Sequence, residues 1–418
     1  MSEIKASILG LKKSFGFGDR LGNATPGHFA AAKKFDFAPI YAQQSIREMA
    51  RTQRTAEEVM EAAVRALTQL GYTGEWGADA DHLKTREDIQ VTTRAGFCFF
   101  TIDPSEYVVN EADTMSEGAL QEAVAKLQAD GILSADWESV YLGKTFEIDE
   151  NITLQFDREA LYRAAVKYAR AIDYSVKMAG WIAEENAGRA YEVEVSVDET
   201  DSPTSPLEHL FFGYELKQRG AKQIVSLAPR FIGDFEKGID YKGDLKEFEA
   251  RLVEHVAVAK YCGPYKISVH SGSDKFSAYP IIGRVCGDLL HVKTAGTSYL
   301  EALRVVVRVN PGLFKEIAAY CAGRFEEDLK SYHISTNAAD VAALAGTSDS
   351  DLEEIYLNQN QGRQLLHVTF GSVLTLGKAA NGQTFKQGVM DILNSNEALH
   401  QEVLDIHFTK HLQLLNQG

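Results

Sequence analysis

Short apolar runs alternate with helical patterns along much of the chain. Eight runs have the length and the β-branched or aromatic residues of strands. They cover residues 13–20, 37–45, 96–103, 191–200, 222–230, 266–272, 289–296 and 330–336. Between strands the apolar residues recur at helical spacing, as in residues 56–71, where Thr55 is a predicted N-cap and Gly71 a predicted stop. Strand–helix alternation predicts parallel strands joined by right-handed crossovers.

Eight such units close a TIM (β/α)8 barrel, and we predict this α/β fold. An open, doubly wound sheet is the alternative. Two observations favour the barrel. The first strand is not followed by a complete G-x-G-x-x-G motif, and polar residues follow nearly every predicted strand rather than one or two of them.

One long segment interrupts the alternation, because residues 104–190 are mostly helical in pattern. We therefore predict that residues 1–103 form the first part of the barrel and that 104–190 form a helical insertion or lid after the third strand. Residues 191–383 would complete the barrel, and residues 384–418 would add helices on its outside.

Composition narrows the class of protein. Of the 418 residues, 45% are hydrophobic and 24% charged, which is ordinary for a globular chain. No apolar run approaches the ~20 residues that span a bilayer, and the N-terminal apolar stretch is too short for a signal peptide, so we expect a cytoplasmic protein with no membrane partner. The four cysteines form no C-x-x-C pair, which favours reduced core residues. A net charge of −16 disfavours binding to nucleic acid.

In a barrel the chemistry lies at the carboxyl ends of the strands, so the residues that follow each predicted strand are candidates for the site. His270 ends an apolar strand and is followed at once by small and polar residues, a mixture that is unusual where a strand only completes a core. The other candidates are Asp103, Asp198, Glu199, Arg230, Asp240, Lys275 and Lys293. Carboxylates with an imidazole suit Mn, Co, Ni, Fe or Zn.

Each candidate also has a structural interpretation. His270 can be a hydrogen-bonded core residue, and Asp240 can be a turn residue beside a glycine. Arg230 can form a fork on a carboxylate or clamp its own loop. Lys275 and Lys293 can form salt bridges, bind an anionic group of a substrate, or act as Schiff-base nucleophiles.

Five segments form a more specific pattern when they are taken together. They are FGFGDRLGNATPGH (15–28), SVDETDSPTSPLEH (196–209), SLAPRFIGDFEKGIDYKGD (226–244), KISVHSGSDKFSAYPI (266–281) and HVTFGSVL (367–374). This pattern resembles the tagaturonate epimerase family. The resemblance implies a metal-dependent sugar-acid epimerase of uronate catabolism that interconverts D-tagaturonate and D-fructuronate. Close relatives of such an enzyme are expected to act on the neutral ketohexoses D-tagatose and D-fructose.

The implied reaction limits the mechanism. The inverted carbon lies β to the ketone, so its hydrogen is not acidified and simple deprotonation is disfavoured. A β-hydroxy ketone can instead undergo retro-aldol cleavage, rotation of the aldehyde and re-formation of the bond. A divalent Zn, Mn, Co or Ni ion would stabilise the enediolate, and carboxylates would move protons. The alternative route, transient oxidation by a nicotinamide, lacks a dinucleotide fingerprint in this chain.

The resemblance and the strand-end positions together suggest roles. We expect His270 to bind the metal with Asp240 and with one earlier acid, Glu199 or Asp103. The acid that is not a ligand would carry the proton. Asp198 is the reserve candidate, since strand alternation would point Asp198 and Glu199 in opposite directions, so that only one of them faces the site.

Lys275 and Arg230 are expected to hold the carboxylate of the substrate, and Lys293 is a further candidate for that role. Two other classes of function stay open, because a fold does not determine a reaction. One is a metal-dependent isomerase or aldolase on the same barrel, and the other is a non-catalytic protein that binds a sugar acid.

Overall fold

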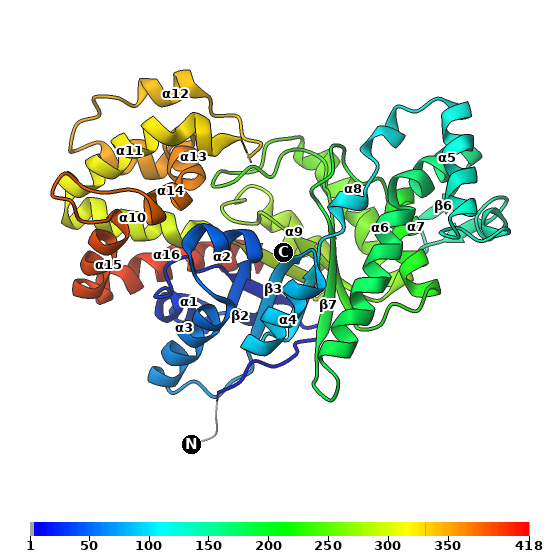
Figure 1. The fold of residues 1–418 in the computed structure, drawn as a ribbon, viewed down its shortest axis with the longest axis horizontal. Helices are drawn as coiled ribbons and strands as arrows, with labels where there is room; N and C mark the ends of the chain where they lie inside the picture. The colour runs from blue at the N-terminus through cyan, green and yellow to red at the C-terminus, as the bar shows by residue number, and fades with distance from the viewer. Residues whose placement is uncertain (1–3, 331, 418) are drawn as a thin grey trace.

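Eight parallel strands close into a barrel in the computed structural model, which describes residues 4–330 and 332–417 (Figure 1). The strands are β1 (Ser14–Phe17), β2 (Ala38–Ser45), β3 (Gly77–Leu83), β4 (Phe99–Ile102), β7 (Glu192–Val197), β8 (Ile224–Pro229), β9 (Lys266–Val269) and β10 (Leu290–Thr294). They follow chain order around the barrel, and β10 closes it by pairing with β1, with Ser14 opposite His291. The predicted TIM-type barrel is confirmed.

Seven of the eight predicted strands coincide with barrel strands. One barrel strand is missed and one predicted strand is wrong, so the number of strands is still eight. β3 is the strand that the hydrophobic pattern does not predict, because its sequence GADADHL consists largely of residues with low strand propensity. The strand predicted at residues 330–336 is wrong. Residues 332–336 form no helix or strand and connect two helices, while Ser331 lies outside the described residues.

Helices follow most of the barrel strands and cover the outside of the barrel. They are α1 (Thr25–Ala32), α2 (Ile46–Thr52), α3 (Ala56–Gln69), α4 (Arg86–Ala95), α7 (Pro206–Gln218), α8 (Leu245–Cys262), α9 (Tyr279–Cys286) and α10 (Thr297–Val309). The predicted N-cap at Thr55 is confirmed. Its side chain accepts from the amide of Glu58, whose carboxylate accepts in turn from the amide of Thr55, and this capping box fixes where α3 begins.

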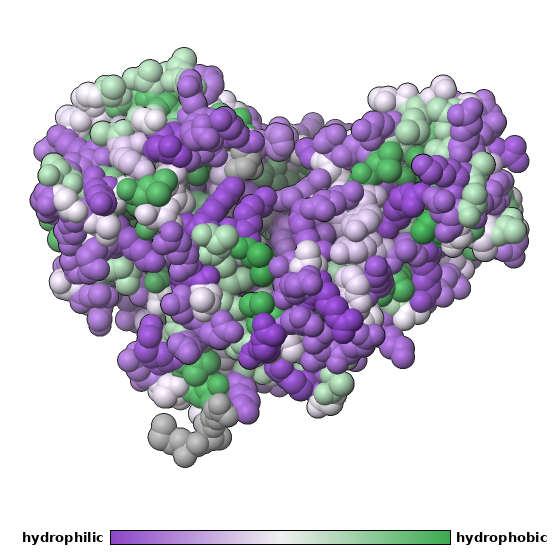
Figure 2. Space-filling view, in the orientation of Figure 1, coloured by the Kyte–Doolittle hydropathy of each residue, from purple (hydrophilic) through white to green (hydrophobic). Residues whose placement is uncertain are grey.

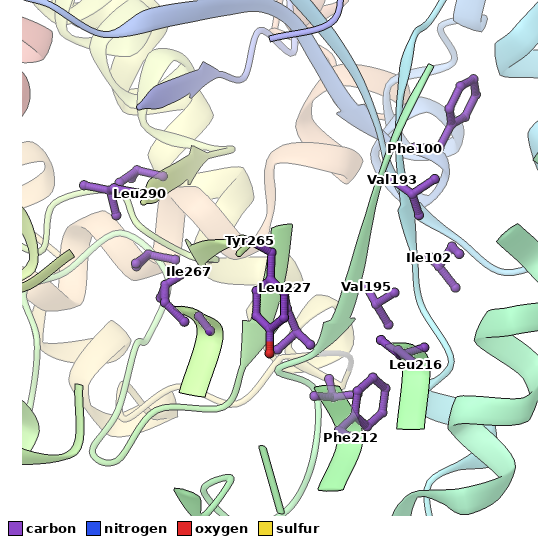
Figure 3. Close-up of a cluster of buried hydrophobic side chains, with 14 of the residues drawn as sticks. Phe100, Ile102, Val193, Val195, Phe212, Leu216, Leu227, Tyr265, Ile267 and Leu290 are labelled. Atoms are coloured by element: carbon purple, nitrogen blue, oxygen red, sulfur yellow. The ribbon is translucent and has the colours of Figure 1, made fainter. Parts of the chain in front are cut away.

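The main core lies between the strands and the helices rather than inside the barrel. Val193 and Val195 of β7, with Leu227 of β8, pack towards Phe212 and Leu216 of α7 (Figure 3). The alternate strand positions carry polar side chains that point inward. Buried examples are Ser14, Asp79, Thr101, Glu192, Glu194, Lys266, Ser268, His291 and Lys293. This barrel therefore has a polar interior, whereas bulky branched side chains usually fill such a barrel.

The predicted insertion follows the fourth barrel strand and not the third, because β3 adds a strand before it. It contains η1 (Ser105–Tyr107), η2 (Asn110–Asp113), α5 (Glu117–Ala129), η3 (Trp137–Val140), the hairpin of β5 (Thr145–Glu147) and β6 (Thr153–Gln155), and α6 (Arg158–Glu185). α6 packs against both α5 and α7. Together these elements form the lobe on the right of Figure 1.

The barrel also ends earlier than the predicted boundary at residue 383. Its last strand stops at Thr294, and the described residues that follow add only helices and isolated bridges. Those after α10 are α11 (Pro311–Leu329), α12 (Ala338–Ala343), the π-helix η4 (Glu354–Asn358), α13 (Asn360–Val368), α14 (Phe370–Thr375), α15 (Phe385–Ser395) and α16 (Glu397–Leu415). α10 to α15 enclose a second hydrophobic core, and α16 runs back along α1, α9 and α10.

The two helical lobes stand on either side of a hollow, which Figure 2 shows at the upper edge of the molecule. α2, which follows the carboxyl end of β2 directly, lies beside this hollow (Figure 1). Within the described ranges, no helix is both long enough and apolar enough to cross a membrane.

Candidate active site

A buried lysine occupies the centre of the barrel near the carboxyl ends of its strands. Lys293 Nζ lies 2.8 Å from Asp79 Oδ2, 2.8 Å from Asp81 Oδ1 and 2.9 Å from Glu194 Oε1, and it donates to Thr101 Oγ1 at 2.5 Å. Burial opposes the charge, but the three carboxylates raise the pKa of Lys293 far above its ordinary value. Burial and the neighbouring carboxylates raise the pKa of Asp79 to about 7, even though Lys293 acts in the opposite direction. Lys293 is therefore an ammonium at neutral pH.

His270 lies beside this lysine, with its ring between two carboxylates. Nε2 lies 2.6 Å from Glu194 Oε1, and Nδ1 lies 3.2 Å from Asp198 Oδ1. Burial alone would lower the pKa of His270, but Asp198 and Glu194 outweigh burial and the repulsion of Lys293 and raise this pKa to about 9. In the metal-free protein this imidazole is positively charged at neutral pH.

β3 adds a second histidine to the same group. His82 Nδ1 lies 2.8 Å from Asp81 Oδ1, and its ring centroid lies 5.0 Å from that of His270. Asp81 and Asp198 raise the pKa of His82 well above its ordinary value, against the effect of burial. Its φ of 55° is unusual for a residue with a side chain, so the backbone is strained where it turns this ring towards the site.

The donor set of Asp81, His82 and His270 fits a divalent cation. The ligand atoms of these three residues all lie within 4.8 Å of one another. The carboxylates of Asp79, Asp81 and Glu194 surround the ammonium of Lys293, and a fourth, of Asp198, lies beside His270. A divalent ion carries the same charge as the two protons that make the imidazoles cationic. The imidazoles must lose these protons to bind a metal. Glu194 Oε2 is also buried without a hydrogen-bond partner.

A cavity opens over this charged cluster. Its outer part has a volume of ≈ 340 Å³, and its floor narrows to ≈ 50 Å³ above the cluster. The residues that line both parts are Arg47, Asp198, Glu199, Lys237, His270, Ser271 and Tyr332. The walls therefore combine strand ends, α2, the loop between β8 and α8, and a connection of the C-terminal helical lobe.

Asp198 and Glu199 both line the cavity, so the expectation that only one of them faces the site is wrong. β7 ends at Val197, and the two-residue alternation of a strand does not continue beyond it. Asp198 accepts from Ser196 Oγ and lies beside His270, whereas Glu199 Oε1 lies 3.1 Å from Arg47 Nη2 at the rim.

The structure does not bring Asp240 or Asp103 to His270. Asp240 accepts from the amide and the hydroxyl of Ser277 at 3.1 and 3.0 Å and lines a different cavity. Asp103 is buried and accepts from the amide of Ser105 at 3.0 Å, which stabilises the turn after β4. Asp240 binds the segment after β9 and Asp103 binds the turn after β4, so their assignment as ligand or proton carrier of the His270 site is wrong.

Lys275 does not face the cavity either. Its side chain is fully buried, and its ammonium donates to the carbonyl oxygens of Glu236, Ile239 and Ser273 at 2.8, 2.5 and 2.9 Å. All three of its donors are therefore engaged by the backbone, which contradicts its predicted contact with substrate. Arg230 does line the outer cavity, but its guanidinium donates to the carbonyl of Thr200.

Comparison with known proteins identifies the family. Residues 1–415 match the family model described as tagaturonate epimerase, UxaE. The chain belongs to the tagaturonate epimerase family. Epimerases are isomerases, so the protein is an enzyme of that class. The segments that carry the resemblance in the sequence, among them 196–209 and 266–281, run out of barrel strands into the loops around the cavity.

Relatives of this epimerase cover nearly all of its chain. The tagaturonate/fructuronate epimerase of Thermotoga maritima is 44% identical over 414 residues, which are 99% of this chain and 82% of that protein. The glycerol complex of the fructuronate-tagaturonate epimerase UxaE from Cohnella laeviribosi is 40% identical and has a TM-score of 0.92 over 99% of this chain and 83% of that one. The native structure of the same protein gives the same values.

The epimerase holds a second carboxylate–histidine group, made of Asp274, His407 and His411. Its surroundings differ, because Asp274 Oδ2 lies 2.8 Å from Arg363 Nη2. Both ring nitrogens of His411 are engaged, one by the amide of Asp274 at 3.0 Å and the other by the carbonyl of His407 at 2.8 Å. Burial, with His407 beside it, lowers the pKa of His411 to about 3. This second group serves as a structural network.

Sequence reasoning misses the acids that surround Lys293 in this epimerase. Asp79 and Asp81 lie in the unpredicted strand β3, and Glu194 lies inside β7 rather than after it. The signal that could have found Asp79 and Asp81 is the alternation of alanine and aspartate in GADADH, which places both carboxylates on one face of a strand.

Proposed function

We propose that this epimerase interconverts D-tagaturonate and D-fructuronate and that Asp81, His82 and His270 hold a divalent metal ion for the reaction. The relatives from Thermotoga maritima and Cohnella laeviribosi are named for these two sugar acids. The observation that carries the metal assignment is the cluster of ligand atoms within 4.8 Å at the floor of the cavity, surrounded by excess carboxylates.

A divalent ion bound there would supply positive charge that polarises the ketone of the substrate and stabilises an enediolate. The protein prepares the ligands for this ion. Although burial opposes ionisation, His82 and Lys293 hold the pKa of Asp81 well below its ordinary value, so Asp81 is available as a carboxylate. Asp198 Oδ1 lies 3.2 Å from His270 Nδ1 and 3.8 Å from His82 Nε2, which restrains both rings.

Glu199 is our candidate for the group that moves the proton. It stands in the cavity wall with 38% of its side chain exposed, so a substrate hydroxyl can reach it. Burial would raise its pKa, but His82 and Arg47 hold the pKa of Glu199 below its ordinary value, so it is an acceptor at neutral pH. Asp103, the other acid predicted for this role, lies in the turn after β4 and not beside His270.

In the proposed reaction Glu199 accepts the proton of the hydroxyl on the inverted carbon. The bond between that carbon and its neighbour then breaks to give an aldehyde and an enediolate. After the aldehyde presents its other face, the same bond forms again and Glu199 returns the proton. Atoms and electrons balance, because the product is an isomer of the substrate.

The surroundings of the two lysines disfavour a Schiff-base mechanism and so favour the metal-assisted retro-aldol route. A Schiff base requires a free amine, but Lys293 is held as an ammonium by three carboxylates. Lys275 donates to three backbone carbonyls and is closed off from the cavity. A metal-assisted retro-aldol route uses the groups that do face the cavity.

The test is turnover after the protein is stripped with a chelator and reloaded with Mn, Co, Ni or Zn. D-fructuronate and, separately, D-fructose are supplied in deuterated water. We expect the C4 epimer only with metal and with no deuterium on the inverted carbon, because retro-aldol cleavage leaves that hydrogen in place. An aldose would indicate an isomerase, and three-carbon fragments would indicate an aldolase. Full activity without metal would overturn the metal assignment.

A further inference from the structure

One cation of the cavity forms no ion pair within 4.0 Å with a carboxylate of the described residues. Lys237 lies in the loop between β8 and α8 and lines both the outer cavity and its floor. Its ammonium donates to Oγ of Ser271 at 2.5 Å, and Ser271 follows His270 in the chain. No carboxylate of the described residues forms an ion pair with Lys237 within 4.0 Å.

Neighbouring cations are committed to groups of the protein. Arg20 Nη2 lies 2.8 Å from Glu48 Oε1, and Arg47 Nη2 lies 3.1 Å from Glu199 Oε1. Lys293 is enclosed by its carboxylates. Arg51 lines only the floor and donates to the hydroxyl of Tyr332, and Arg230 lines only the outer part and donates to the carbonyl of Thr200. Lys237 lines both parts and can accept a carboxylate from a ligand without first breaking an ion pair.

The backbone around Lys237 is held by buried polar side chains. Lys275 donates to the carbonyls of Glu236 and Ile239 at 2.8 and 2.5 Å, and Arg363 Nε donates to the carbonyl of Gly238 at 2.6 Å. Gly238 takes a positive φ of 74°, which a side chain would strain. This segment is preorganised, so little conformational freedom remains to be lost when a ligand contacts Lys237.

The cavity needs such a cation if it is to take an acid. Asp198, Glu199, Asp201 and Asp234 line its outer part and repel an anion. From these observations we infer that Lys237 binds the carboxylate of the substrate and sets the preference of the enzyme for sugar acids over neutral ketohexoses. This inference rests on the proposed function and deepens it. The carboxylate takes the place of Ser271 Oγ as partner of the ammonium, whereas a neutral hydroxymethyl group gains no such charge interaction.

The test compares Lys237→Met and Lys237→Arg in the metal-loaded enzyme, with D-fructuronate and D-fructose as substrates. A charge-assisted hydrogen bond implies that Lys237→Met lowers kcat/KM for D-fructuronate about 10- to 100-fold, mostly through KM. The loss of kcat/KM on D-fructose is much smaller, and Lys237→Arg restores most of the loss on D-fructuronate. The matched control is Lys222→Met, which replaces an exposed lysine before β8 and leaves kcat/KM unchanged for both substrates.

An equal loss on both substrates, or a loss of bound metal, would overturn the inference. Calorimetric titration of wild type and Lys237→Met with D-fructuronate separates it from the proposed function. If the wild type binds this acid in a Lys237-dependent way but does not epimerise it, the function fails and the inference stands. If both proteins epimerise it with unchanged KM, the inference fails and the function stands. Absence of binding to the wild type would overturn the inference.

Discussion

Two groups of one carboxylate and two histidines lie within the described part of the chain, and they behave in opposite ways. Asp81, His82 and His270 sit at the end of the barrel, and Asp274, His407 and His411 sit between the loop after β9 and α16. The pKa of His270 is raised to about 9, whereas that of His411 is lowered to about 3.

The difference comes from the charges around each group. At the barrel end three carboxylates contact Lys293 and a fourth, of Asp198, lies beside His270, so the negative charge in excess of the lysine is met by protons on histidine or by a metal ion. In the other group Asp274 pairs with Arg363, and the nearby Glu301 pairs with Arg304. The charges there already balance. Ligand atoms at suitable distances do not by themselves identify a metal site, and the surplus of charge decides.

The largest effect should follow from removing the cation that balances the second group. Arg363→Met leaves Asp274 buried without its partner, which we expect to lower the free energy of unfolding by about 3–5 kcal/mol. Denaturant unfolding measures it. The control is Arg284→Met, which breaks the exposed pair of Arg284 with Glu249 and should cost less than about 1 kcal/mol. Equal losses in the two variants would show that Asp274 does not depend on Arg363.

The next effect separates the two groups by their metal content. His82→Ala or His270→Ala should weaken metal binding by at least about 100-fold, since losing a ligand costs more than losing a residue that only orients one. Turnover should fall with it. His411→Gln should retain the metal of the wild type. Elemental analysis after dialysis gives the result, and full metal content in His270→Ala would remove the triad from consideration.

The smallest of these effects is a pH dependence of stability. The unfolded chain protonates His411 below its ordinary pKa of 6.5, whereas the folded protein keeps it neutral down to about 3. Its contribution to stability is therefore present above pH 6.5 and lost on acidification, by about 2 kcal/mol at pH 5. His411→Gln should flatten the loss of unfolding free energy between pH 7 and 5 by this amount.

The matched control for this titration is Gln413→Ala, which replaces an exposed residue of the same helix that does not titrate. It should leave the slope between pH 7 and 5 at that of the wild type. The same slope in His411→Gln and the wild type would contradict the neutral state assigned to His411.

The barrel could be predicted from the sequence because most of its strands are short apolar runs followed by polar residues. β3 could not, since its inward aspartates and small outward alanines lack the hydrophobic signal of a strand. The run at 330–336 has the composition of a strand, but the barrel offers its described residues no free sheet edge, because β1 and β10 already pair with each other. Tertiary context decides both cases.

The site was predictable where it lies at strand ends. His270, Asp198, Glu199 and Lys293 line one cavity, although only one of Asp198 and Glu199 was expected to face it. Asp240 and Lys275 do not, because the paths of their loops depend on contacts with α13 and with the segment after β9, which no local pattern records. Lys237 lies in the same loop as Asp240, and only the folded loop shows which of its side chains turns towards the cavity.

The closure of the barrel joins two strands that the ribosome makes at very different times. Ser14 of β1 pairs with His291 of β10, 277 residues further along the chain. At about 5–20 residues per second, a ribosome needs roughly 14–55 s to make that partner after β1 has been translated. Phe15 and Phe17, which are fully buried in the finished enzyme, point outward and pack against Phe408 of α16, so they wait still longer for that cover. The first strand made is thus among the last to be completed on the nascent chain.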